Sequence, residues 1–426
     1  MLPAIIPRAA ADWQPLLPDA AVQRTLGRMA FDQILPVAKP QTDVRRLILL
    51  LGVSCFAGAF GGRVLDPFVT TLAAEFDSPV RQAALLASAY ALPFALIQPI
   101  LGPIGDAVGK RRIIQVGLCC LTLFCLAAPL APSLGVLLAL RALAGMAAGG
   151  IMPLTLAAVG DAVPIEGRQV ALSRLLVFSI VGQIAGGAVA GALGGVIGWR
   201  GVMLLCAALA AAAAVVMLAI PLSREPETRG RFDPVRAIRR YRSILALPQA
   251  RLLYAAVAIE GVLIFGTFPY FAPMLEGRGL GGSLGATAEA GMTVAAFGAG
   301  GVVYAMVARP LLARLGQGRM VVLGAGLAGL ALVGFGLASG VAVFVASGLA
   351  LGTGFYMIHN SIQTRVTELA PEARGSAVAL HAFHFFTGQS LGPVLMGLAL
   401  AGLGAAPALA LAAVAILALG LRLARR

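Results

Sequence analysis

Charged side chains are scarce in this sequence. Only 12% of its 426 residues are Asp, Glu, Lys or Arg, and 59% are hydrophobic, whereas a typical soluble domain carries about 25% charged residues. So few charges cannot cover the surface of so large an apolar core. This shortage excludes an ordinary soluble enzyme and a disordered chain. The net charge of +14 does not indicate nucleic-acid binding, because the basic residues lie at the ends of apolar stretches.

Cysteine and histidine are also rare, with five and three residues. Each cysteine falls within an apolar stretch, and none has metal-ligand spacing with a histidine, so we expect small buried side chains, no disulfides and no metal. The sequence shows no Ser/His/Asp arrangement and no nucleotide-binding motif. We therefore expect neither an enzyme nor an ATP-driven pump, and no cofactor.

Long apolar stretches dominate what is present. We count twelve of them between residues 47 and 423, and a membrane helix needs about 20 apolar residues. The sequence thus predicts an all-α integral membrane protein with twelve transmembrane helices. Of the 32 Lys and Arg residues, 27 fall on the side of the termini, three on the other side, and Arg63 and Arg141 inside stretches. This asymmetry predicts cytoplasmic termini, and the heavy use of Ala, Gly and Arg suggests a bacterial genome and therefore an inner-membrane location.

Polar segments divide the chain into four parts. Residues 1–45 form a proline-rich cytoplasmic tail without a signal-peptide cleavage site, either mobile or partly an amphipathic helix on the membrane. Six apolar stretches follow in 46–222, and six more in 250–424. The most polar interruption, 223–249, is a cytoplasmic linker between these two predicted helical bundles.

The two bundles repeat each other at an offset near 206 residues. Gly182-Gln183-Ile-Ala-Gly186 matches Gly388-Gln389-Ser-Leu-Gly392, and Gly145 falls on Gly352. Two six-helix halves in parallel repeat are the architecture of many secondary transporters, whose site lies between the halves near the midplane. We therefore predict two pseudo-symmetric six-helix bundles.

Three motifs make the resemblance more specific. Residues 102–112 read Gly-Pro-Ile-Gly-Asp-Ala-Val-Gly-Lys-Arg-Arg, and an Arg-x-x-x-Gly motif ends at Gly145. The chain thereby resembles the major facilitator superfamily, in particular its bacterial drug- and sugar-efflux proton antiporters. That branch usually reads Gly-Pro-x-x-Gly-Gly in the fifth span, and here Gln183 replaces the proline. The fifth-span motif consists of Gly182, Gln183, Gly186 and Gly187.

The resemblance implies that the loop motif acts as a conformational switch. Asp106 follows a helix end and can reach the positive N-terminus of a neighbouring helix. The basic residues Lys110, Arg111 and Arg112 can pair with Asp161 or Glu166. In the family such a cluster holds the two halves together on the inner side. Simple positive-inside anchoring is the alternative. The motif residues are Gly102, Asp106, Gly109, Lys110 and Arg111.

Charges inside apolar stretches are costly, at least ~2.5–3.5 kcal/mol each at the bilayer centre on insertion scales. Arg63 and Asp66 lie three residues apart in the first span, Arg141 in the fourth and Glu260 in the seventh. In the family these spans line the central cavity. We therefore expect these four residues to serve proton coupling or substrate binding in the cavity, although Asp66 would be structural if it pairs with Arg63 or Arg141. Glu260 has no basic neighbour within a helical turn and is the better proton carrier; a fixed hydrogen-bond acceptor is the alternative.

A second polar group falls in the tenth and eleventh spans. His381 and His384 share one helix face. They and the polar residues named at the end of this paragraph form either a path for substrate or protons or a set of structural side chains whose hydrogen bonds are satisfied. A zinc site would lack a third ligand. The remaining candidates for the cavity are His359, Asn360, Gln363 and Gln389.

These patterns predict a monomeric secondary transporter that moves a small organic solute by alternating access. Proton-coupled efflux is the function that we predict first. The missing fifth-span proline keeps proton-coupled uptake or facilitated diffusion open, and a transporter-like sensor or lipid-handling scaffold is a further alternative. Its partners would be a small-molecule substrate, protons and membrane lipid, with no nucleic acid.

Overall fold

The structure is a computed structural model that describes residues 41–163, 165–218, 234–280, 282, 284–370 and 373–425. The chain forms two units, Met1–Arg46 and Leu47–Arg426. All regular structure in the described residues is helical, as predicted. The predicted tail before residue 41 and the linker before residue 234 lie outside the described residues, and the predicted bundle boundaries stay predictions.

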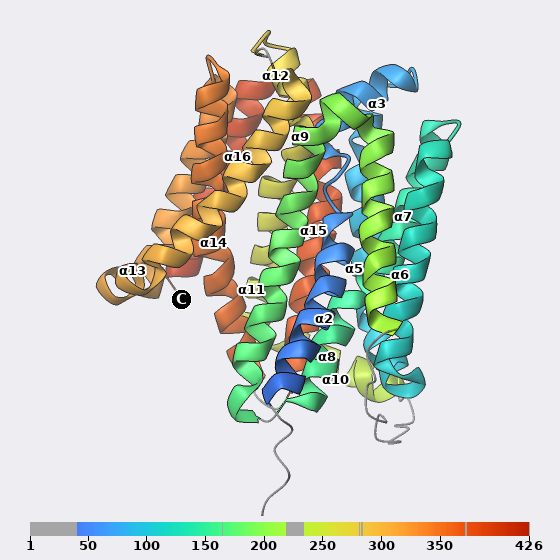
Figure 1. The fold of residues 1–426 in the computed structure, drawn as a ribbon. Helices are drawn as coiled ribbons and strands as arrows, with labels where there is room; N and C mark the ends of the chain where they lie inside the picture. The colour runs from blue at the N-terminus through green and yellow to red at the C-terminus, as the bar shows by residue number, and fades with distance from the viewer. Residues whose placement is uncertain are drawn as a thin grey trace, which may run out of the picture. The chain divides into compact units, whose positions relative to one another are not determined.

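The helices fall into a first half and a second half of the chain (Figure 1). The first half contains α2 (Gln41–Phe60), α3 (Val69–Glu75), α4 (Val80–Ala83), α5 (Leu85–Val108), α6 (Lys110–Ala127), α7 (Leu134–Gly149), α8 (Ile151–Ala162) and α9 (Ile165–Leu218). After α10 (Pro234–Ala246), the second half contains α11 (Pro248–Glu260), α12 (Phe271–Glu276), α13 (Ala286–Leu337), α14 (Val341–Leu369), α15 (Arg374–Leu403) and α16 (Ala405–Ala424). Short turns of other helix types interrupt the chain at η1 (Asp66–Phe68), η2 (Ala128–Leu130), η3 (Gly261–Phe265) and η4 (Phe268–Tyr270).

Nine helical stretches of the described residues are long and apolar enough to cross a membrane. Two of them, Val177–Leu218 and Ala286–Leu337, have 42 and 52 residues, about twice what a bilayer needs. Each breaks at a glycine with positive φ, Gly198 (63°) and Gly316 (71°), so each contains two spans. The all-helical membrane fold is therefore confirmed, and the count of twelve spans stays a prediction.

Glycines with positive φ also show the internal repeat in the backbone. Gly109 (φ 107°) separates α5 from α6, and Gly316 breaks α13 at the equivalent position 207 residues later. Gly198 breaks α9, and Gly404 (φ 79°) separates α15 from α16, 206 residues later. Positive φ is accessible to glycine at little cost and is rare for other residues. The chain reversals between these spans therefore favour glycine at all four positions.

Both halves also unwind at one equivalent point. In the first half α2 ends at Phe60, and a 3₁₀ turn containing Pro67 leads into α3. In the second half α11 ends at Glu260, the chain continues as the π-helical turn η3, and a 3₁₀ turn containing Pro269 then leads into α12. The first and seventh spans are thus discontinuous helices, and an unwound segment at membrane depth is tolerated where protein surrounds it.

Glycine also permits the closest helix contacts. A Cβ at Gly145 of α7 would collide with the carbonyl oxygen of Tyr90 on α5, and one at Gly352 of α14 would collide with the carbonyl oxygen of Phe297 on α13. Residues 145 and 352, and likewise 90 and 297, differ by the same 207 positions. The same backbone-to-backbone packing thus occurs once in each half, as small residues allow between membrane helices.

The fifth-span glycines pack α9 against both halves. A Cβ at Gly182 or Gly186 would meet backbone carbonyls of α2, and one at Gly187 would lie 2.8 Å from Cγ1 of Val294 on α13. One turn further along α9, a Cβ at Gly191 would collide with the backbone of α13. These glycines therefore set the distance between α9 and its two neighbours.

Contacts between the halves gather at the end of the molecule where α3 and α12 lie (Figure 1). The Thr70 hydroxyl of α3 donates to Glu276 Oε1 of α12 at 2.9 Å. Close to that end, the hydroxyl of Ser88 on α5 donates to the carbonyl oxygen of Ser390 on α15 at 2.6 Å, and the Ser390 hydroxyl donates back to the Ser88 carbonyl at 3.4 Å. We call this the α3/α12 end, and in this structure the two halves meet there.

Candidate functional site

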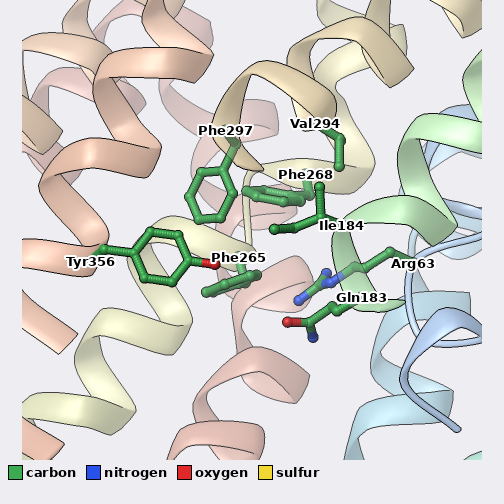
Figure 2. A pocket seen from close by; sticks show the side chains of 8 residues that line it. All are labelled: Arg63, Gln183, Ile184, Phe265, Phe268, Val294, Phe297 and Tyr356. Carbon is green, nitrogen blue, oxygen red and sulfur yellow. The ribbon is translucent and has the colours of Figure 1, made fainter. Parts of the chain in front are cut away.

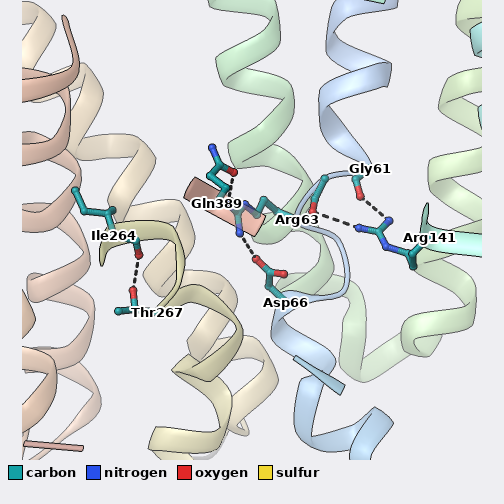
Figure 3. Close-up of polar contacts among 8 residues, drawn as sticks. Gly61, Arg63, Asp66, Arg141, Ile264, Thr267 and Gln389 are labelled. Atoms are coloured by element: carbon teal, nitrogen blue, oxygen red, sulfur yellow. Dashed lines mark hydrogen bonds and ion pairs between the residues drawn. The ribbon is translucent and has the colours of Figure 1, made fainter. Parts of the chain in front are cut away.

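Arg63 lies in the unwound segment after α2 and contacts both halves. Its side chain is buried, and Nη1 donates to Asp66 Oδ2 at 3.1 Å. Nη2 donates to Oε1 of Gln389 on α15. The guanidinium also lies over two rings of the second half, Phe265 at 4.7 Å and Phe268 at 5.2 Å from the centroids, which are cation–π distances. Of the two partners predicted for Asp66, the structure pairs it with Arg63 (Figure 3).

Arg141 of α7 serves the backbone of the same segment. Because α2 ends at Phe60, the carbonyls that follow lose their helical partners. Arg141 Nη1 donates to the Gly61 carbonyl at 2.8 Å and Nη2 to the Gly62 carbonyl at 3.3 Å. Its guanidinium lies 4.4 Å from the Tyr90 ring centroid, and 1% of the residue is exposed. The observed contacts make Arg141 a cap for the unwound helix.

The second half satisfies its break differently. Gly62 and Ile264 correspond when the prolines of the two 3₁₀ turns are aligned, at a local offset of 202 residues, because each lies five residues before its proline. The Ile264 carbonyl accepts a hydrogen bond from the Thr267 hydroxyl at 2.6 Å (Figure 3). The same carbonyl also accepts the Thr267 backbone N–H at 3.3 Å, so local donors satisfy it without an arginine, and the cationic groups described in this region belong to the first half.

Glu260 ends α11 and is completely buried. Its Oε2 lies 2.8 Å from Nδ1 of His359 on α14, whereas Oε1 has no hydrogen-bond partner. The His359 ring packs on Phe355 and Phe385 at centroid distances of 4.8 and 4.7 Å. Although the sequence shows no basic residue within one turn of Glu260, a histidine 99 residues away supplies the neighbour. A carboxyl oxygen without a partner in an apolar core is a place where a proton can be held.

The histidines form one cluster within the second half. His381 of α15 lies edge-on to His359 at 5.1 Å between centroids, is buried, and has no partner for Nε2. His384 stacks on Tyr254 at 5.0 Å, and its Nδ1 lies 2.7 Å from the Leu380 carbonyl oxygen. Gln389 belongs with Arg63 instead. Asn360 and Gln363 are half-buried on α14, and their role stays a prediction.

A small pocket adjoins Arg63 at the junction of the halves (Figure 2). It has room for about one water molecule in this structure. The first half contributes Arg63 and two side chains of α9, and the second half contributes aromatic rings from the seventh, eighth and tenth spans. The residues that line it are Arg63, Gln183, Ile184, Phe265, Phe268, Val294, Phe297 and Tyr356.

The loop motif lies at the other end of the molecule. Lys110 Nζ pairs with Asp161 Oδ2 at 2.5 Å, which is one of the two predicted partners. Arg111 Nη2 donates to the carbonyls of Met217 and Leu218 at 3.1 and 3.2 Å and so caps the C-terminal end of α9. Gly102 is helical, and the side chains of Asp106 and Glu166 lie outside the described part of the chain. A switching role for the motif stays a prediction.

Two polar features of the structure were not predicted from the sequence. Glu289, in the first turn of α13, is 3% exposed; its Oε1 accepts from the Gly282 N–H at 2.6 Å and Oε2 has no partner. A carboxylate three residues inside an apolar stretch was the available signal. At the α3/α12 end, Glu75 of α3 accepts from Trp199 Nε1 at 2.7 Å and from Arg200 Nη2 at 2.5 Å.

Glu75 lies outside the spans, so water reaches it. Partial burial acts to raise the pKa of Glu75, but the hydrogen bonds from Arg200 and Trp199 and the charge of Arg200 outweigh burial and lower the pKa below the ordinary glutamate value. Across the described residues, no group of three His, Cys, Asp or Glu side chains is arranged to hold a metal ion.

Two repeated helical halves, interrupted α-helices in the first and seventh spans and buried charges where the halves meet are features found in many secondary transporters. The chain belongs to the Major Facilitator Superfamily, which it matches over residues 51–393 and again over 286–425.

Individual relatives match only part of the chain, at about 30% identity. The chain is 30% identical over 154 residues to the uncharacterized MFS-type transporter YwfA of Bacillus subtilis (strain 168), covering 36% of this chain and 37% of that one. It is 33% identical over 180 residues to the MFS efflux transporter aclA of Aspergillus oryzae (strain ATCC 42149 / RIB 40), covering 40% and 32%.

A third relative is the vacuolar membrane amino acid uptake transporter fnx2 of Schizosaccharomyces pombe (strain 972 / ATCC 24843), 28% identical over 182 residues, which cover 43% of this chain and 29% of that one. The matches thus span less than two-fifths of these relatives' own length.

Proposed function

We propose that this protein is a secondary active transporter that exports a small organic solute across a bacterial inner membrane in exchange for protons. The observation that carries the proposal is Glu260, a fully buried carboxyl beside His359 with one oxygen unpartnered. A carboxyl that has no fixed charge partner in an apolar surrounding exchanges a proton more readily than one held in an ion pair.

Alternating access is the movement that such a site requires. The halves meet at the α3/α12 end through Thr70–Glu276 and Ser88–Ser390, whereas the Lys110–Asp161 pair at the opposite end joins two helices of the first half. This supports a state closed at the α3/α12 end. Rocking of the halves about the central side chains would open that end and close the other.

Proton-coupled uptake is a second candidate, because one relative is named as an amino acid uptake transporter while others are named as efflux transporters. In both cases we propose cytoplasmic termini, since most basic residues lie on that side. The direction of proton movement separates the two candidates.

The test uses protein reconstituted in liposomes that contain a pH-sensitive dye. Dyes, drugs, sugars and amino acids are added one at a time to wild type, Glu260→Gln and, as a matched control, Glu368→Gln, which removes an exposed carboxylate at the end of α14. We expect solute-dependent proton movement in wild type and Glu368→Gln and none in Glu260→Gln. Solute flux without proton movement, equal in all three proteins, would make the protein a uniporter and reduce Glu260 to a structural residue.

A further inference from the structure

The charges next to the pocket do not balance. Arg63 pairs with Asp66, and Arg141 binds the Gly61 and Gly62 carbonyls directly before Arg63 in the chain (Figure 3). All three are at most 4% exposed. Within the described residues, this cluster holds two guanidinium groups and one carboxylate, a net charge of +1 away from water. A buried charge without a counter-charge is costly, and a bound anion would remove that cost.

Hydrogen-bond donors converge beside the surplus charge. A guanidinium offers five N–H donors in a fixed fork, of which Arg63 uses one for Asp66 and one for Gln389. Gln389 is 2% exposed, and its Nε2 has no partner. The Gln183 amide lies next to the Arg63 guanidinium on the pocket wall (Figure 2). These groups suit the oxygens of a carboxylate or sulfonate.

The facing wall is aromatic. Phe265 contacts Phe268 at 5.0 Å and Phe297 at 5.7 Å between ring centroids, and Tyr356 lies 6.1 Å from Phe297. These rings belong to the second half, and the donors Arg63 and Gln183 to the first. A ligand that spans the pocket must therefore offer an anionic group to one half and a flat apolar body to the other.

We propose that the protein transports an organic anion that carries an aromatic ring, with Arg63 and Gln183 binding the anionic group and Phe265 and its neighbouring rings binding the ring. This substrate class rests on the proposed transport function. In the present closed arrangement the pocket admits about one water, and because both halves line it, it widens when they part. The Gln183 that departs from the family's proline thereby gains a role in substrate choice.

Binding is tested by isothermal titration calorimetry of the full-length protein in lipid nanodiscs. The probes are 2-naphthoate, the cation 2-naphthylmethylammonium and the non-aromatic anion cyclohexanecarboxylate. We expect 2-naphthoate to bind most tightly. In the Arg63→Gln/Asp66→Asn double variant, which leaves no carboxylate unpaired, it should bind about tenfold more weakly, the loss expected for a charge-assisted hydrogen bond. Arg319→Gln, which removes an exposed arginine of α13, should bind like wild type.

Two further variants separate binding from mere structure. Asp66→Asn removes the carboxylate that competes for Arg63, so naphthoate should bind more tightly than to wild type, a gain that a purely structural ion pair does not give. Phe265→Leu should weaken naphthoate several-fold and leave cyclohexanecarboxylate unchanged. Tighter binding of the cation than of naphthoate, or equal naphthoate binding in wild type and the double variant, would overturn the proposal.

Flux measurements in liposomes keep the two claims apart. Naphthoate that binds through Arg63 but does not cross the membrane would leave the site assignment standing and count against transport. Flux of a cationic or sugar substrate, without competition from naphthoate, would support transport and refute the anionic substrate class.

Discussion

Arg63 and Phe265 occupy equivalent positions of the two halves and lie against each other, with the guanidinium carbon 4.7 Å from the ring centroid. Each lies four residues before the proline of its 3₁₀ turn. The internal repeat therefore brings two equivalent sites together and gives them different chemistry, a cation on one side and an aromatic face on the other. The symmetry of the backbone is broken where the buried polar groups meet.

Replacing Arg141 should destabilise the protein. Arg141→Ala leaves the Gly61 and Gly62 carbonyls without their donor, and two unsatisfied buried carbonyls cost about 2–4 kcal/mol. Arg141→Lys keeps the charge but loses the two-pronged geometry, so it should fall between alanine and wild type. Thermal unfolding in detergent measures this order. An alanine variant as stable as wild type would show that the contacts do not support the unwound segment.

The closely packed glycines should not tolerate alanine. Gly145→Ala and Gly352→Ala each place a methyl group on a backbone carbonyl of the neighbouring helix, and such overpacking costs about 1–3 kcal/mol. Gly160→Ala and Gly326→Ala are matched controls, since no atom lies within 4 Å of the added Cβ. The controls should be neutral or gain up to about 1 kcal/mol of helix propensity. Melting temperatures of the four variants test this difference. Equal losses of melting temperature in all four would contradict the prediction.

Locking the α3/α12 end should stop transport. Ser88 and Ser390 exchange hydrogen bonds between the halves, so cysteines at both positions should form a disulfide under mild oxidation. If opening of this end is part of the cycle, oxidation should arrest solute flux and dithiothreitol should restore it. The two single-cysteine variants are the controls, because the protein also has native cysteines. Wild-type flux in the cross-linked protein would refute rocking of the halves.

The contribution of Glu75 should depend on pH. Its folded pKa lies below the ordinary value, which is about 4.3 in unfolded peptides. The ionised carboxylate therefore stabilises the fold fully above that pH, and the stabilisation is lost as pH falls through the lower folded value. Unfolding of wild type and Glu75→Gln, compared from pH 7 to 3, should show a difference that is greatest near neutrality and disappears in acid. A difference that does not change over this range would exclude the ion pair as its cause.

The sequence predicted most of the architecture because apolar length and internal repetition are local properties. Gly145 and Gly352 were matched from the offset alone, and each packs on a backbone carbonyl of a neighbouring helix in the structure. The Arg63–Asp66 contact followed from a spacing of three residues. A spacing of three suits one face of a continuous helix, whereas the pair lies where α2 has already ended.

Distant contacts could not be predicted in this way. In the sequence no basic residue lies within one helical turn of Glu260, and its partner in the structure, His359, comes from another helix. Gln389 was grouped with the histidines of its own helix, but it lies eight residues beyond His381, about 12 Å along α15, and reaches Arg63 instead. Such pairs depend on how whole helices pack, which periodicity does not record.

The short separation of Arg63 and Asp66 has a consequence for biogenesis. Gln389 is 326 residues further along the chain, so the ribosome has not yet made it when the first span leaves the translocon. Arg63 alone would then face lipid at a cost of about 2.5–3.5 kcal/mol. With Asp66 three residues away, the nascent span already carries its own counterion and can partition as a neutral unit, and the amide of Gln389 is added only in the last tenth of the 426 residues.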